Sequence, residues 1–269
     1  MNGGRGALLQ MRFHFGERDR DGDGPLEAAV MDACARRGVR AAALVRAVAG
    51  FGAKQRLRTD RLLSLSEDAP LVAIAVGEAD VINALADEVR EIAAEGLVVL
   101  EEVGGAQTTG TPTPSAAVVG APVVSAPEGR VEVTVWGPRT GPTAPHLETV
   151  AALRKHGAES ATVLLGVDGV LDGERRRARF VAGNRGVPAM TVGVGTRAAI
   201  DAALAEVDGA AHLVTVAPVA TYRRHATVSR HGEGGVERKS VIDRLSLHGG
   251  AAVRVTLVTS EVASRGSHP

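Results

Sequence analysis

Residues 12–52 read RFHFGERDRDGDGPLEAAVMDACARRGVRAAALVRAVAGFG, and residues 132–171 read EVTVWGPRTGPTAPHLETVAALRKHGAESATVLLGVDGVL. The two stretches share one pattern of glycines and apolar residues. The matched pairs lie 118 to 121 residues apart: Gly16 and Gly137, Leu26 and Leu147, Gly38 and Gly157, Gly50 and Gly169, Pro70 and Pro188. Spacings that change only by small loop deletions are typical of a duplicated domain. The chain is therefore predicted to hold two equivalent units.

Hydrophobic periodicity predicts the same order of elements in each copy: strand, helix, strand, strand, helix, strand. In the first copy these elements are expected at residues 12–15, 25–37, 39–48, 71–76, 79–94 and 97–103. In the second copy they are expected at residues 131–136, 146–156, 161–166, 189–194, 197–206 and 212–216. A βαββαβ order is that of a ferredoxin-like sandwich, with two helices on one face of an antiparallel sheet. The predicted fold class is α+β, with two such domains in tandem.

The ends of the first helix carry specific signals. Asp23 or Gly24 is expected to cap it, with Pro25 in its first turn, and Gly38 is expected to end it.

The expected domain boundaries follow composition. Residues 1–10 are expected to be disordered, residues 11–104 and 130–218 to form the two domains, and residues 219–269 to form a βαβ-like extension. Residues 105–129 are rich in Pro, Thr and Gly and are predicted to be a linker, although the uncharged run within them is long enough to span a bilayer. The expected location is cytoplasmic, because no secretory signal precedes the first domain.

Composition excludes several classes of function. Lys+Arg and Asp+Glu both number 31, so no overall positive charge exists to hold nucleic acid. Aromatic residues are only 2 %, too few for base-stacking platforms. Cys34 is the single cysteine, which excludes an intrachain disulfide and a cysteine-rich zinc site, and its apolar neighbours indicate a buried, inert thiol.

Five motifs follow one another along residues 11–103: FGERD at 15–19, GPL at 24–26, GFG at 50–52, RLRT at 56–59 and LSEDAP at 65–70. In this order they resemble the DUF190 family of PII-like proteins. The second copy resembles a divergent member, which keeps Trp136-Gly137, Gly169 and Pro188 but lacks the Phe and Gly that would follow Gly169. The family typically has His where this sequence has Arg58, which is a modest departure.

The resemblance implies a ferredoxin-like fold that assembles as a homotrimer. It further implies that a small effector, often an adenine nucleotide, binds in clefts between subunits and that a mobile loop reports its presence to a partner. DUF190 genes commonly neighbour those of a fluoride exporter, so the resemblance also suggests a membrane transporter as partner. We expect no cofactor and no enzymatic activity.

The connection after the second strand is basic in both copies. Lys54, Arg56, Arg58 and Arg61 occupy it in the first copy. The second copy has Arg175, Arg176, Arg177 and Arg179 there. Arginine forks can hold phosphate or carboxylate, whereas the alternative is a solvated turn or ion pairs to Glu67, Asp68 and Glu174. The predicted ligand-binding set is Gly16, Glu17, Arg18, Gly50, Phe51, Gly52, Lys54, Arg56, Arg58 and Arg61.

Two other motifs are interpreted as structural. Residues 19–24, DRDGDG, match the first half of an EF-hand loop, but Val30 stands at the twelfth position where a bidentate Glu is needed. Residues 193–198, GVGTRA, imitate a dinucleotide fingerprint, but the acidic ribose partner about 20 residues on is absent. We expect a capped turn at the first motif and a strand-to-helix turn at the second.

The leading hypothesis is a non-enzymatic PII-like regulator that binds a small anionic effector. One alternative is a divalent-metal-binding tolerance protein resembling the CutA relatives, which would share fold and trimer. Another is an accessory protein of a fluoride exporter. A small enzyme is the third class considered, although neither an acid/base pair nor a nucleophile elbow is placed by spacing.

Overall fold

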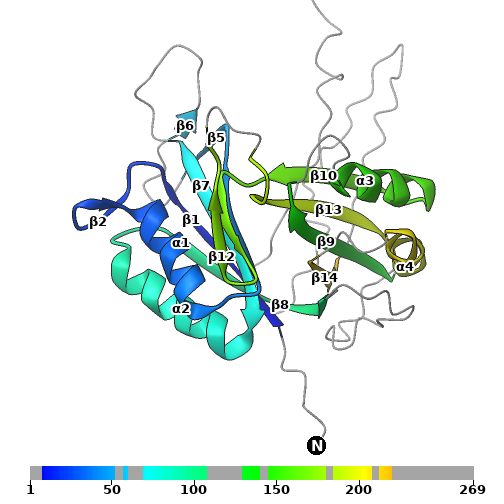
Figure 1. Cartoon of the computed structure of the whole chain (residues 1–269), viewed down its shortest axis with the longest axis horizontal. Helices are drawn as coiled ribbons and strands as arrows, with labels where there is room; N and C mark the ends of the chain where they lie inside the picture. The colour runs from blue at the N-terminus through cyan, green and yellow to red at the C-terminus, as the bar shows by residue number, and fades with distance from the viewer. Residues whose placement is uncertain are drawn as a thin grey trace, which may run out of the picture. The chain divides into compact units, whose positions relative to one another are not determined.

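The computed structural model describes residues 8–51, 57–59, 69–107, 129–139, 145–179, 184–207 and 212–219 (Figure 1). The first copy comprises β1 (Leu8–Gly16), α1 (Leu26–Arg37), β4 (Ala41–Arg46), β7 (Pro70–Glu78), α2 (Ala79–Ile92) and β8 (Leu97–Gln107). The second comprises β9 (Arg130–Pro138), α3 (Pro145–Lys155), β10 (Ser160–Leu165), β13 (Pro188–Thr196), α4 (Arg197–Glu206) and β14 (Leu213–Pro218). Three short hairpins are added: β2 (Arg20–Asp21) with β3 (Gly24–Pro25), β5 (Ala49–Phe51) with β6 (Leu57–Thr59), and β11 (Asp168–Leu171) with β12 (Glu174–Arg177).

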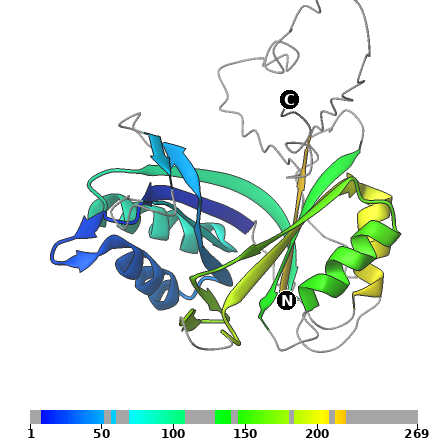
Figure 2. The ribbon, with the colours of Figure 1, turned by 90° about the horizontal axis from the view of Figure 1, so that it is seen from above.

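Strand order confirms the ferredoxin-like prediction for both copies. The four main strands run β8-β1-β7-β4 in the first copy and β14-β9-β13-β10 in the second, and all neighbours are antiparallel. Counted within each copy, both orders are fourth, first, third, second. The helices of each copy pack on each other and on one face of their own sheet, as Figure 2 shows for α3 and α4. The two halves thus share one topology.

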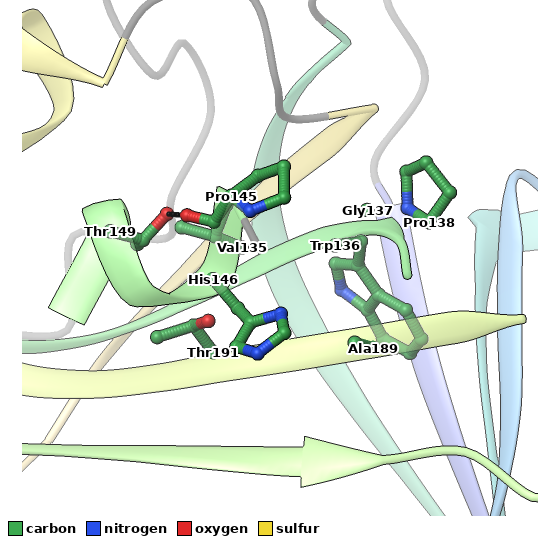
Figure 3. A pocket seen from close by; sticks show the side chains of 9 residues that line it. All are labelled: Val135, Trp136, Gly137, Pro138, Pro145, His146, Thr149, Ala189 and Thr191. Atoms are coloured by element: carbon green, nitrogen blue, oxygen red, sulfur yellow. Dashed lines mark hydrogen bonds between the residues drawn. The ribbon is translucent and has the colours of Figure 1, made fainter. Parts of the chain in front are cut away.

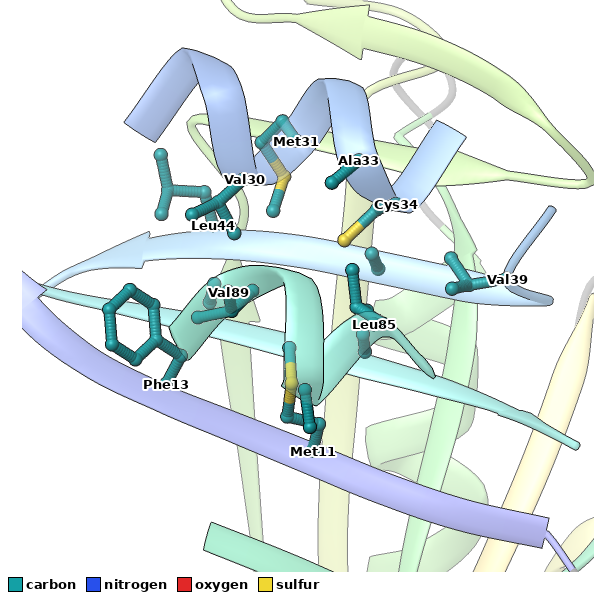
Figure 4. Close-up of a cluster of buried hydrophobic side chains, with 14 of the residues drawn as sticks. Met11, Phe13, Val30, Met31, Ala33, Cys34, Val39, Leu44, Leu85 and Val89 are labelled. Atoms are coloured by element: carbon teal, nitrogen blue, oxygen red, sulfur yellow. The ribbon is translucent and has the colours of Figure 1, made fainter. Parts of the chain in front are cut away.

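The core of the first copy lies between its sheet and its helices (Figure 4). Val30 and Cys34 of α1 meet Leu85 of α2 over Met11 and Phe13 of β1, and all five side chains are fully or almost fully buried. Burial raises the pKa of the Cys34 thiol to about 12, because the thiolate would lose its hydration. The predicted inert thiol is confirmed.

The predicted start of the first helix is wrong, whereas its predicted end is confirmed. Pro25 is the N-cap residue itself, and no side chain caps the helix; the Leu26 N–H instead donates to the backbone oxygen of Asp19 at 3.0 Å. Asp23 and Gly24 belong to the β2–β3 hairpin, or to its turn, rather than to the helix. At the other end Gly38 has φ 66°, the left-handed conformation that favours glycine.

Two of the sequence matches at a spacing of 121 residues are wrong. Pro70 pairs with Gly16, but its counterpart Pro188 pairs with Pro138, so Gly137 corresponds to Phe15. Leu26 is 1 % exposed, whereas Leu147 is 59 % exposed and has a different place on its helix. Since a shift of one residue moves a strand side chain to the opposite face, only the corrected register buries corresponding residues in both copies.

The two copies are not separate domains on a tether; they form one compact unit. The strand β8 continues to Gln107, inside the predicted linker, and residues 104–107 pair with β14. On the opposite side of the first sheet, β11 pairs with β4. A shared core between the two helix-free faces includes Leu8, Val76, Trp136 and Met190.

Other predicted boundaries change or lie outside the described residues. The first strand begins at Leu8, so residues 8–10 are not part of a disordered N-terminus. Residues 108–128 of the predicted linker, and the predicted extension after residue 219, lie outside the described residues. Within the described part of the chain, no helix is both long and apolar enough to span a membrane.

Gly169 is a residue where the backbone of the second copy lies close to that of the first. A Cβ on Gly169 would lie 2.3 Å from the backbone oxygen of Ala42 and 2.7 Å from a ring carbon of Pro188. Neither the β4 backbone nor the proline ring can move aside cheaply, so only glycine allows β11 to lie against β4. This contact explains one glycine of the repeat.

We predict that Gly169→Ala destabilises the chain by about 2 kcal/mol, the usual cost of forcing a group into a filled site. Chemical denaturation followed by far-UV circular dichroism measures the change. Gly24→Ala is the matched control, because its Cβ would meet only the Asp21 oxygen at 3.6 Å, and its effect should stay within about 0.5 kcal/mol. Equal effects of the two variants would contradict the close approach.

Candidate functional site

The predicted turn at Gly16–Arg18 is closed by Asp19. The Gly16 N–H donates to Asp19 Oδ2 at 2.7 Å, and the Asp19 N–H donates back to the Gly16 oxygen at 3.1 Å. The side chain of Arg18 is exposed. The Asp19–Gly24 segment therefore begins with a carboxylate turned toward its own backbone and continues as the β2–β3 hairpin, in agreement with the structural interpretation of this motif.

This turn meets the base of the basic connection at the start of β7. The Glu17 N–H donates to the Ala69 oxygen and the Ala47 N–H to the Pro70 oxygen, both at 2.9 Å. Glu17 also forms an ion pair with Arg46, with 3.0 Å between Oε2 and Nη2. Two predicted segments that are about 30 residues apart in sequence are thus tied to one end of the sheet.

The basic connection of the first copy includes the β5–β6 hairpin. Gly50 pairs with Arg58, and Phe51 pairs with Leu57. The structure describes only the backbone of these four residues. It does not describe Gly52, Lys54, Arg56 and Arg61. The structure therefore ties Arg46 and Ala47, which precede the hairpin, to the Gly16–Arg18 turn and the start of β7, and the ligand-binding role of the ten predicted residues stays a prediction.

The arginines of the second copy form ion pairs with the first copy. Arg175 holds Asp168 in a bidentate pair, with Nη2 2.6 Å from Oδ2 and Nε 3.2 Å from Oδ1, and its Nη1 bonds Asp32 of α1. Arg177 bonds Glu27, also on α1. This arrangement confirms the ion-pair alternative for the second copy in general, with partners on α1 that sequence reasoning missed.

Asp168 is the buried centre of that network. Its side chain is 3 % exposed, and its Oδ1 also accepts the Gly169 N–H at 2.8 Å. The hydrogen bonds that Arg175 donates to Asp168 raise the pKa of the Arg175 guanidinium further above its ordinary value, although partial burial acts in the opposite direction. Arg175 is therefore a charged partner for the Asp168 carboxylate. Among Arg175, Arg176 and Arg177, as far as the structure describes their partners, Arg176 has the partner expected from sequence: it pairs with Glu174 at 2.6 Å on the surface.

A small cavity of about 20 Å³ lies at the start of α3 in the second copy (Figure 3). Thr149 donates from its hydroxyl to the Pro145 oxygen at 3.0 Å, and His146 projects beside it in the figure. The lining residues are Val135, Trp136, Gly137, Pro138, Pro145, His146, Thr149, Ala189 and Thr191. A space of this size holds about one water molecule.

The cavity has a counterpart that is filled in the first copy. In the corrected register, Val135 and Gly137 correspond to Phe13 and Phe15, whose rings stack there with centroids 4.7 Å apart. Replacing two aromatic rings by an isopropyl group and a hydrogen atom leaves the space unfilled. Sequence reasoning missed the cavity because it matched Gly137 with Gly16.

The GVGTRA segment is the predicted strand-to-helix turn. Thr196 ends β13 and is the N-cap of α4, where its hydroxyl accepts the Ala199 N–H at 3.3 Å. Both neighbours of β13 are antiparallel, so the parallel arrangement that a dinucleotide fold needs does not exist at this strand.

A family model described as DUF190, uncharacterized ACR, matches residues 8–104 and 139–221. Among solved structures, the regulatory subunit of aspartate kinase from Thermus thermophilus is 15 % identical, with 74 % of this chain and 92 % of that chain covered and a TM-score of 0.28. An anthrone oxidase-like protein is 12 % identical, with 79 % and 91 % covered and a TM-score of 0.21. Both scores are too low to support a structural argument, and the fold follows from strand order alone.

We predict that Asp168→Ala destabilises the chain by about 3 kcal/mol, because Arg175 would lose the partner of a partly buried charge. Thermal and urea denaturation measure the loss. Glu174→Ala in the same hairpin removes only an exposed ion pair and should cost less than about 0.5 kcal/mol. A small effect of Asp168→Ala would mean that Asp168 is not needed to hold Arg175 against Asp32 of the first copy.

Proposed function

The chain belongs to the DUF190 family, and from this premise we propose that it is a non-enzymatic regulatory protein that binds a small anionic effector, such as an adenine nucleotide. The family match spans both copies, residues 8–104 and 139–221. The effector site is assigned to the first copy, between the Gly16–Arg18 turn and the β5–β6 hairpin. Lys54, Arg56, Arg58 and Arg61 supply the positive charge.

The observation that carries this proposal is the junction at Ala69 and Pro70. Backbone hydrogen bonds from Glu17 and Ala47 bring the turn and the hairpin base to that one place. Arg58 pairs with Gly50, so the hairpin backbone carries the arginine at a fixed register. A ligand bound there would order the basic connection and change the surface offered to a partner, which is a common switching device.

The second copy supports the assignment by contrast. Two arginines of its equivalent hairpin, Arg175 and Arg177, are already paired with Asp168, Asp32 and Glu27, so an anion would have to compete with these carboxylates. In the proposed division of roles, the first copy senses the effector and the second copy stabilises the unit. The resemblance to PII-like proteins adds a cytoplasmic homotrimer and a membrane transporter, such as a fluoride exporter, as the partner.

We predict that ATP, ADP, AMP or a cyclic nucleotide binds the full chain in isothermal titration calorimetry. Arg58→Ala should raise the Kd at least about tenfold, which is about 1.4 kcal/mol. Arg176→Ala is the matched control, because it removes an exposed arginine from the equivalent hairpin of the second copy. Absence of heat with all four nucleotide types would refute the proposed effector class.

The metal-binding alternative has a different signature in the same samples. A divalent cation that raises the melting temperature, with no effect of any nucleotide, would favour the CutA-like function over the proposed one.

We predict that sedimentation equilibrium gives a species of three chains. A stable monomer at micromolar concentration would contradict the trimer and would remove every cleft between subunits.

A further inference from the structure

One hairpin in this chain already extends a sheet that belongs to the other copy. The strand β11 of the second copy pairs antiparallel with β4 of the first, in the register Asp168 to Leu44, Gly169 to Ala43, Val170 to Ala42. The hairpin β11–β12 follows β10 directly, just as the hairpin β5–β6 follows β4. The matching glycines, Gly50 and Gly169, make β5 the counterpart of β11 and β10 the counterpart of β4.

The outer edge of β10 offers backbone groups for the same kind of pairing. The Gly166 N–H donates to Pro188 of the neighbouring strand, and the next N–H, of Val167, donates to Leu44 on the opposite side. Because successive amides of a strand point to opposite sides, the amides of Ala161, Val163 and Leu165 point to the outer edge. Among the described residues, the only strand paired with β10 is β13.

The sequence of β10 lacks the features that usually protect a free edge. Ser160–Leu165 reads SATVLL, with neither a charge nor a proline. Exposed edge strands normally carry lysine, proline or a bulge, because an unprotected edge pairs with other strands. Thr162 and Leu165 are exposed on it. This composition is typical of a strand that is covered in the assembled protein.

Within one chain the β5–β6 hairpin does not reach this edge. The β4–β11 ladder ends at Leu44, and the Ala47 N–H donates to the Pro70 oxygen, which holds the hairpin base at the start of β7. In the described part of the chain, β5 pairs only with β6. As far as the described residues go, the donor hairpin and the acceptor edge are therefore both unpaired with any further strand.

We propose that the β5–β6 hairpin of one chain adds to β10 of a second copy of the chain. The register follows from the β4–β11 ladder: Ala49 opposite Val163, Gly50 opposite Thr162, and Phe51 opposite Ala161. Each chain donates one hairpin and offers one edge, so the contact is heterologous, and it forms a ring where the rotation between neighbouring chains closes. The pairing goes beyond the proposed function, because it requires no effector, and it places Arg58 at a boundary between chains.

The first test is a cross-link in the full chain. Ala49→Cys combined with Val163→Cys should form a disulfide on oxidation that links separate chains, seen as multiples of the chain mass on non-reducing gels. Each single variant is the control, and the native Cys34 is fully buried. A cross-linked product at the mass of one chain would overturn the proposal, since the hairpin would then fold back on its own edge. No cross-link at all would overturn it equally.

The second test weakens the edge without a cross-link. Val163→Pro removes an outward N–H, which an edge strand tolerates, and should weaken association at least about tenfold in sedimentation. Thr162→Lys adds a charge on the same edge and should do the same, even if the proline variant fails to fold. Leu147→Lys, on the exposed face of α3, is the matched control and should assemble as the unmodified chain does. Unchanged association of Thr162→Lys would overturn the pairing.

The cross-linking result and the nucleotide titration test the pairing and the proposed function separately. Chains that cross-link at 49 and 163 but give no heat with nucleotides would support the pairing and refute the effector class. Nucleotide binding by chains that do not cross-link would do the reverse.

Discussion

The bidentate pair of Asp168 and Arg175 is the constraint on which the rest of the structure depends. A carboxylate that is almost completely buried must be paired, and its partner Arg175 also reaches Asp32 on a helix of the other copy. The same short strand contains Gly169, whose missing side chain lets β11 lie against the β4 backbone. Charge pairing and close packing are therefore both found on β11, where the second copy contacts the first. The two copies form one unit with a shared core.

The two copies keep one topology but use it differently. In the first copy, the stacked rings of Phe13 and Phe15 fill the space at the end of β1, whereas the second copy has a small cavity beside the corresponding residues. In the second copy, the hairpin arginines are committed to acidic residues of α1. Duplication thus allowed one hairpin to become a structural element, while its counterpart kept a basic sequence in the first copy.

The two hairpins also explain why one strand edge stays unpaired among the described residues of the duplicated chain. One hairpin satisfies one edge inside the chain, and the equivalent hairpin and the equivalent edge stay apart because backbone hydrogen bonds tie β5 toward β7. Among the described strands, β10 is an edge strand with neither a charge nor a proline, which is unusual for an edge that is left unpaired. The asymmetry between the two hairpins is therefore as informative about assembly as the symmetry between the two folds.

The sequence by itself determined the elements and their order. Alternating and helical patterns predicted every main helix and strand, α4 with both ends correct and Gly38 as the end of α1, because such patterns depend on near neighbours. Family motifs placed the candidate hairpin and turn in the first copy. Only the tertiary structure decided the register of the copies, since Gly16 can be matched to Gly137 until the buried faces are known. Only the tertiary structure joined Arg177 to Glu27 and β8 to β14, because contacts between residues about a hundred or more positions apart depend on how whole faces pack.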